Sequence, residues 1–273
     1  MAKQPPGAPP PPVVQRVRLR YTKRGRLRFT SHRDIARVFE RAVRRAQVPI
    51  AFSAGFSPHP RISWVGAAAT GVASEAEYVE LALAEVVDPE QLRAALDAAL
   101  PDGIDLVDAV IAVPGSSLPE LVQASQWSIR LPGVELADLQ RAVVAFLAAD
   151  VVDVERMTKN GKRTFDARGP VVSMNATASD GCATLALVVQ HVTPAVRPDD
   201  VLTGLASVSD LAPPEPPAAT RLAQGPLTSD GEVGDPLAPD RAAAGHLAGE
   251  AAGATRQAAE AAGEQTESPS PEV

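Results

Sequence analysis

The sequence predicts an α+β protein made of two ferredoxin-like units in tandem, each with the element order strand, helix, strand, strand, helix, strand. Two observations predict it. Short segments in which apolar and polar residues alternate are separated by segments whose apolar residues recur every three or four positions. Turn signals such as Pro101-Asp102-Gly103 lie between them. We place the first unit at residues 13–113 and a second, irregular unit at 125–209.

The first unit begins with an alternating strand that ends at Tyr21. Ser31-His32-Arg33-Asp34 has the pattern of a helix capping box, and an apolar stripe follows from Ile35 to Ala46. Asp88-Pro89 predicts the start of a second helix. The other strands of this unit are expected at Ile50–Ser53, Arg61–Val65, Tyr78–Val86 and Ile104–Val113.

The second unit contains the same two kinds of pattern with softer boundaries. Helices are expected near Leu136–Leu147 and after Arg197, and Asn160-Gly161 predicts a hairpin turn. The single cysteine, Cys182, lies in an apolar strand and is interpreted as a small buried hydrophobe. One cysteine excludes a disulfide framework and an iron–sulfur cluster, and we expect neither a metal nor a cofactor.

Both ends are expected to be disordered. Residues 1–12 are a proline-rich leader, and residues 210–273 have no aromatic residue and are rich in alanine, glycine, proline and acids. We interpret the latter as an acidic tail. No apolar run is long enough to cross a membrane and no signal peptide is evident, so we expect a cytoplasmic protein.

The formal net charge of −7 averages three unlike parts. Residues 1–64 carry +12, residues 65–209 carry −11, and residues 210–273 carry −8. Such an asymmetry points to an anionic partner for the first unit. Glu75, Glu77 and Glu80 are expected to form ion pairs with nearby arginines.

This charge predicts RNA binding, without catalysis, through phosphate contacts. Backbone recognition is expected rather than base stacking, because the sheet lacks paired aromatic residues. The alternatives are a solvated basic surface and a protein-docking module that does not touch RNA. The predicted contacts are Arg16, Arg18 and Arg20 on an open sheet face, Arg37 and Arg41 on the helix, Arg61, and a second cluster of Lys159, Lys162 and Arg163.

Two histidines lie in segments that we predict to form a binding loop. His32 begins the first helix and His59 lies between two prolines. They are interpreted either as structural residues or as phosphate ligands, and the remaining alternative is a metal-independent RNA endonuclease that uses both. The predicted binding loop comprises Ser31, His32, Asp34, Gly55, Phe56, Pro58 and His59.

The runs Arg28–Asp34, Phe52–Ser63 and Gly71–Tyr78 resemble a known family. Their Ser-His-x-Asp and Gly-Phe-x-Pro-His-Pro patterns are similar to those of the radical SAM-linked proteins, which are encoded beside or fused to a B12-binding-type radical SAM protein. The resemblance covers residues 14–209, although Gly169 stands before Pro170 where the family tends to read Asp-x-Arg-Pro. It implies a radical SAM partner. Because a radical SAM cluster needs three cysteines, the chain would be its companion subunit.

Overall fold

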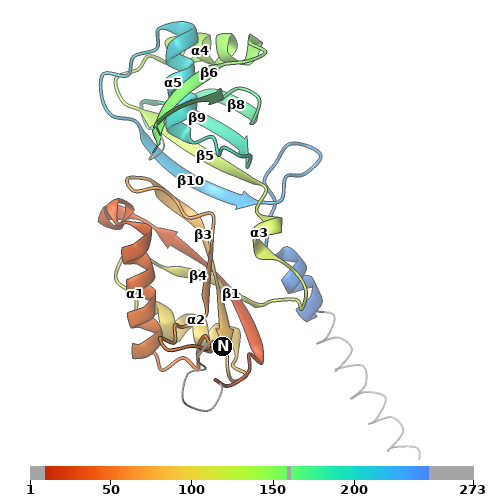
Figure 1. Cartoon of the computed structure of the whole chain (residues 1–273). Helices are drawn as coiled ribbons and strands as arrows, with labels where there is room; N and C mark the ends of the chain where they lie inside the picture. Colours follow the sequence, from red (N-terminus) through yellow and green to blue (C-terminus); the bar gives the residue numbers. More distant parts are fainter. Residues whose placement is uncertain (1–9, 159–160, 246–273) are drawn as a thin grey trace, which may run out of the picture.

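The structure, a computed structural model, describes residues 10–158 and 161–245. It is an α+β protein with one main mixed sheet of eight strands (Figure 1). The strands of the main sheet are β1 (Gln15–Lys23), β2 (Ile62–Val65), β3 (Ala73–Leu83), β4 (Leu106–Ile111), β5 (Ala124–Leu131), β8 (Val171–Ser179), β9 (Cys182–Gln190) and β10 (Ala218–Gly225). They follow the order β4-β1-β3-β10-β5-β9-β8, and β2 pairs with the part of β3 that β10 leaves free.

In the first half, residues 10–113, two helices cover one face of the sheet. They are α1 (His32–Arg45) and α2 (Pro89–Asp97), and a short 3-10 helix, η1 (Gly25–Phe29), precedes α1. The Ser31 N-cap of the predicted capping box is confirmed, because the Ser31 hydroxyl accepts a hydrogen bond from the Asp34 amide at 3.2 Å. The predicted stripe packs Phe39 against Tyr21 and Trp64. The predicted strand at Ile50–Ser53 is wrong: only isolated bridges form there.

In the second half, residues 124–225, the helices α4 (Leu136–Ala148) and α5 (Pro198–Ser209) pack together over the sheet (Figure 1). Phe146 of α4 is fully buried in this second core. The predicted hairpin forms a separate two-stranded sheet of β6 (Asp153–Thr158) and β7 (Gly161–Asp166). Cys182 is buried, as its apolar strand predicts.

The prediction of a disordered tail from Asp210 is wrong for residues 210–245. Strand β10 lies between β3 and β5 and joins the two halves into one sheet, and residues 238–245 are helical (Figure 1). The second half therefore ends at Gly225 rather than near residue 209. The rest of the predicted tail and residues 1–9 of the leader lie outside the described residues.

The second face of the first half is covered by segments from elsewhere in the chain. A short helix, α3 (Leu118–Leu121), and Leu237 pack against Val65 and Tyr78, and Leu237 has no exposed surface. Apolar side chains thus line both faces of this part of the sheet. The predicted open sheet face is largely absent.

Candidate functional site

The arginines of β1 do not form an open phosphate-binding face, and this prediction is wrong. Arg18 has no exposed surface and Arg20 is half-buried. Arg16 remains exposed but pairs with Glu80 at 2.9 Å, while the Arg20 guanidinium donates to the Glu75 carbonyl at 3.0 Å. Because β1 and β3 are neighbours with Arg18 opposite Glu80, the Glu80 carboxylate pairs with both Arg16 and Arg18.

Arg18 is held by groups that are distant in sequence. Its guanidinium donates to the Glu80 carboxylate at 3.0 Å, to the Ser116 carbonyl at 2.8 Å and to the Asp240 carboxylate at 2.8 Å. Asp240 is itself fully buried and also accepts from the Val113 amide at 2.8 Å. A buried guanidinium with these partners is structural. It cannot contact RNA.

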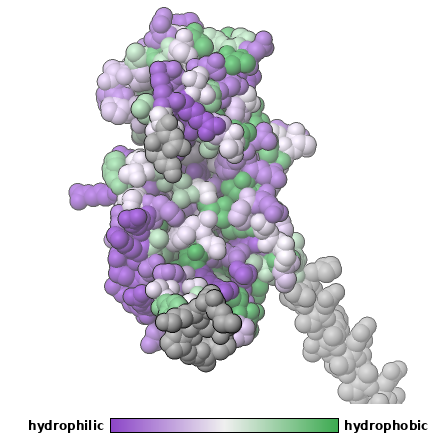
Figure 2. All heavy atoms as spheres, in the orientation of Figure 1, coloured by the Kyte–Doolittle hydropathy of each residue, from purple (hydrophilic) through white to green (hydrophobic). Residues whose placement is uncertain are grey.

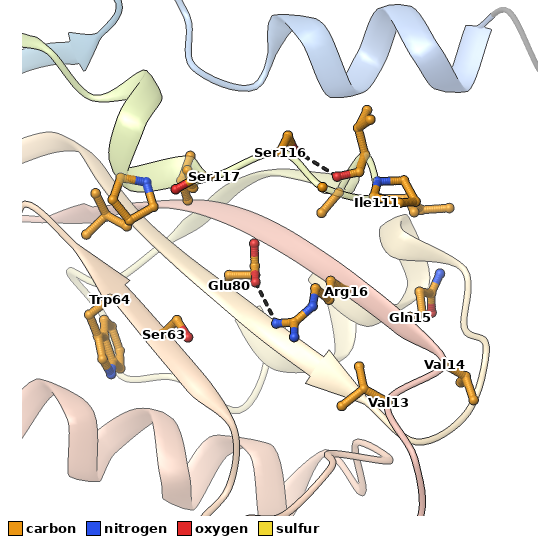
Figure 3. Close-up of a pocket in the computed structure, with 17 residues that line it drawn as sticks. Val13, Val14, Gln15, Arg16, Ser63, Trp64, Glu80, Ile111, Ser116 and Ser117 are labelled. Atoms are coloured by element: carbon orange, nitrogen blue, oxygen red, sulfur yellow. Dashed lines mark hydrogen bonds and ion pairs between the residues drawn. The ribbon is translucent and has the colours of Figure 1, made fainter.

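The segments that cover this sheet face leave a groove of about 820 Å³ on it. Figure 3 shows Arg16 and Glu80 facing each other in its floor, with Ser116 and Ser117 on one wall. The two floor charges satisfy each other, and much of the remaining lining is apolar. The groove is therefore unsuited to a phosphate.

The outward face of α1 carries a group of exposed cations. Four arginines at helical spacing share it and all are exposed: Arg33, Arg37, Arg41 and Arg44. Among the described residues, only Arg37 of these has an ion pair, with Asp34 at 3.3 Å, and both side chains are more than half exposed. Figure 2 shows hydrophilic residues gathered along the side of the first half where Figure 1 places α1.

An exposed aromatic ring adjoins the start of this helix. Phe29, the last residue of η1, is 59% exposed, and the Arg28 guanidinium lies 4.6 Å from its ring centroid. The backbone here is ordered, since the Arg28 carbonyl accepts from the Gly71 amide at 2.7 Å. Nothing in the sequence singled out Phe29 as an exposed ring.

The two histidines are not brought together. The His32 ring packs edge-on against Trp64 at 5.3 Å between centroids, whereas the His59 backbone amide donates to the Ser53 hydroxyl at 3.0 Å. Both histidines are exposed, and no contact joins them in the described part of the chain. This arrangement gives the endonuclease alternative no paired imidazoles.

The predicted binding loop divides into two separate parts. Ser31 and Asp34 are occupied with capping α1, where the Ser31 hydroxyl also donates to the Asp34 carboxylate at 2.7 Å. Gly55, Phe56 and Pro58 form an exposed loop before β2, in which Gly55 has a φ of 131° and Phe56 is 67% exposed.

Arg61 is exposed, as predicted, but does not belong to the α1 surface. Ile62 and Trp64 of β2 pack toward the α1 core, while Val65 packs on the opposite face. Because side chains alternate along a strand, Arg61 lies on the groove side of the sheet. Arg61 and the α1 arginines therefore occupy different layers.

The second basic cluster is partly neutralised. Lys162 pairs with Glu155 across the β6–β7 hairpin, Arg163 is exposed, and Lys159 lies outside the described residues. The neighbouring loop is organised by Asp166, whose carboxylate accepts from three backbone amides, those of Val152, Arg168 and Gly169, at 2.8–3.0 Å. Burial alone would raise the pKa of Asp166, but these amides and the Arg168 guanidinium outweigh it, and the pKa is lowered.

A buried charged cluster lies where the two halves meet; an ion pair of Glu77 was expected, but Arg221 and Lys23 were not predicted to take part. Glu77 pairs with Arg221 of β10 at 3.0 Å, and the Arg221 guanidinium stacks on Trp127 of β5 at 4.8 Å. Lys23 donates to the Ala69 carbonyl at 3.2 Å, and burial lowers its pKa. Only 3% of Lys23 is exposed, so this cation also serves the fold.

Neither a metal cluster nor a membrane span is found in the described ranges. No group of three or more histidine, cysteine or acidic side chains is placed to hold a metal ion within residues 10–158 and 161–245. In the same ranges, no helix combines the length and apolar character needed to cross a bilayer.

Comparison with known proteins identifies the family. The sequence model of the uncharacterised proteins conserved in bacteria called DUF2344 matches residues 16–198. The chain belongs to this family. The DUF2344 match includes α1 and most of the second half, but not β10 or Asp240.

Other comparisons add little to the DUF2344 assignment. Among curated proteins, none matches the chain. A crystal structure of a protein assigned to the Dyp-type peroxidases of Shewanella oneidensis is similar over 72% of this chain and 84% of its own, with 9% sequence identity and a TM-score of 0.20. A similarity of that size carries no argument about function.

Proposed function

We propose that this DUF2344 protein is a non-catalytic RNA-binding factor and that the exposed face of α1 is its contact surface. The observation that carries the proposal is the row of arginines at positions 33, 37, 41 and 44, with which no buried carboxylate of residues 10–158 and 161–245 forms an ion pair. Successive residues four apart in a helix lie about 6 Å apart along its axis. Such a row suits a chain of phosphates better than a single anion.

The electrostatics of α1 favour an anionic polymer. Asp34 and Glu40 are the only acids in the helix, and Asp34 is itself exposed. Guanidinium groups bind phosphate through planar, forked donors and keep their charge at any physiological pH. Each phosphate contact to single-stranded nucleic acid contributes about 0.7 to the slope of log K against log salt concentration.

We interpret each half as a ferredoxin-like unit. The strand orders β4-β1-β3-β2 and β10-β5-β9-β8, each with two helices, support this interpretation. In the first unit the sheet face opposite the helices is covered, so RNA would contact the helix layer instead. This differs from the usual sheet-face mode of RNA recognition in such units.

The test is RNA retention by the full chain at several salt concentrations. Arg37→Gln with Arg41→Gln should lower the salt slope by about 1.4, because two phosphate contacts of about 0.7 each are lost. The control is Arg130→Gln with Arg141→Gln, which removes the same charge from the second half. It is matched because in each pair one exposed arginine is bound to an aspartate three residues away and the other has no ion pair in the described structure.

The proposal requires the control to keep the wild-type slope. Equal losses for both pairs would show that only net charge matters, and the α1 surface would then have no specific role. If the full chain binds no RNA even at low salt, the proposed RNA-binding function is wrong.

The partner is a further part of the proposal. The resemblance of Arg28–Asp34 and Phe52–Ser63 to the radical SAM-linked proteins supports a role in which the chain presents RNA to a radical SAM enzyme. Purification of the chain from its native cells, with sequencing of bound RNA and identification of bound protein, tests this. A radical SAM protein recovered at high salt with no RNA would favour the docking alternative.

A further inference from the structure

We infer that the RNA is single-stranded where it meets α1 and that one unpaired base stacks on Phe29. This inference rests on the proposed function and names its substrate class. It revises the expectation that base stacking has no place on this protein.

Phe29 is one of three exposed phenylalanines, with Phe52 at 41% and Phe56 at 67%, and it is the one that precedes α1. The chain has two tryptophans, two tyrosines and six phenylalanines, and several of them, such as Tyr21 and Phe39, are buried in the cores. Phe29 is instead 59% exposed, although a single exposed apolar side chain is not by itself significant. Its surroundings provide the second observation.

The backbone on either side of the ring is hydrogen-bonded, and one cation lies against the ring. The hydrogen bonds from Gly71 to the Arg28 carbonyl and from Thr30 to the Leu27 carbonyl, at 2.7 and 2.9 Å, fix the backbone on both sides. The Arg28 guanidinium lies 4.6 Å from the ring centroid, within the range of a cation–π contact. Phe29 therefore presents its ring from an ordered stretch of backbone, with one guanidinium against it.

Phe29 is close in sequence to the arginine row. Phe29 lies two residues before the N-cap Ser31, and Arg33 follows in the first turn of α1. A strand whose phosphates follow the row from Arg44 towards Arg33 would reach Phe29 at the end of the helix. The positive end of the helix dipole lies there too and adds to the attraction for phosphate.

This combination distinguishes single strands from duplexes. In a duplex, bases are paired and stacked on each other, so an external ring cannot stack on them. Single-strand binding proteins combine a basic track with aromatic platforms, and stacking tolerates any base because every base has a π-face. The arginine row alone would bind both forms of RNA.

The test compares Phe29→Ala and Phe29→Trp with wild type in the full chain. The probes are a mixed-sequence RNA of about 15 nucleotides, within the site sizes common for such proteins, and its blunt duplex. Phe29→Ala should weaken single-strand binding about tenfold, since one stacked base contributes about 1–3 kcal/mol. Duplex binding should not change. Phe29→Trp should bind like wild type, and its fluorescence should be quenched by the single strand.

The control is Val86→Ala, which removes an apolar side chain that is 79% exposed at another turn. It should leave both affinities unchanged. If wild type binds single strand and duplex equally and Phe29→Ala changes neither, the stacking inference is wrong while RNA binding by α1 stands. If wild type binds neither RNA at low salt, the proposed RNA-binding function is wrong, and the stacking inference that rests on it is wrong as well. Unfolding curves for each variant separate loss of binding from loss of fold.

Discussion

The buried pair of Arg18 and Asp240 should be a principal stabilising contact between the first half and residues 226–245. Replacement of Asp240 by alanine removes the carboxylate 2.8 Å from the guanidinium and leaves the Val113 amide without its acceptor. The Arg18 side chain is 1% exposed, so bulk solvent does not reach the guanidinium. The variant should therefore be strongly destabilised.

The size of the destabilisation depends on the contacts that Arg18 keeps after Asp240 is replaced. Loss of one partner of a buried ion pair costs about 3–5 kcal/mol. Glu80 still binds the guanidinium at 3.0 Å, which favours the lower end, and the orphaned amide adds about 1 kcal/mol. We expect about 3–4 kcal/mol, a large part of the 5–15 kcal/mol typical of a folded domain, and a fall in Tm of about 6–15 °C.

Denaturant and thermal unfolding, followed by circular dichroism, measure this loss. Arg241→Gln is the matched control in the same helix, because its ion pairs with Asp108 and Asp235 are on the surface and should contribute no more than about 1 kcal/mol. Arg18→Met combined with Asp240→Leu should recover most of the stability, because no unpaired charge remains. Equal, small effects of Asp240→Ala and Arg241→Gln would refute the buried contact.

Two further predictions concern other segments. Gly225→Ala should destabilise the protein by about 1–3 kcal/mol in urea unfolding, because a Cβ there would lie 2.0 Å from the Gly234 carbonyl oxygen, whereas Gly245→Ala meets no atom and should not destabilise it. The lowered pKa of Asp166 stabilises the fold at pH values above the unfolded pKa of about 3.9, and this contribution is lost as pH falls through the folded pKa. Acid titration of stability should therefore show the difference between wild type and Asp166→Asn shrinking below about pH 4. A difference independent of pH would contradict this reasoning.

Local signals predicted much of the fold. The cap at Ser31, the stripe through Phe39 and the proline after Asp88 determine where helices begin and which side they bury, and these features depend on residues within a few turns. The expected ion pairs of Glu75, Glu77 and Glu80 with arginines are confirmed. The three acids of β3 were enough to predict that ion pairs form, but the sequence did not show which arginines would be their partners.

Long-range contacts account for what was missed. Alternation in β1 shows that Arg16, Arg18 and Arg20 share a face but cannot show what covers it, since Asp240 is 222 residues from Arg18. Strand β10 reads Ala-Ala-Thr-Arg-Leu-Ala-Gln-Gly, with few β-branched and no aromatic residues, so its own composition does not predict a strand. It becomes one because β3 and β5 offer it hydrogen-bonding edges.

The same long-range contacts determine where the protein can bind RNA. The charge of +12 over residues 1–64 counts Arg18, Arg24 and Lys23, yet carboxylates or carbonyls within the protein satisfy each of them. A cation already paired and desolvated gains little from a phosphate, so the number of arginines overstates the binding surface. What decides affinity is the subset left in water, and on α1 that subset forms one row. Its four positions, rather than the net charge of the segment, should therefore set the salt dependence of RNA binding.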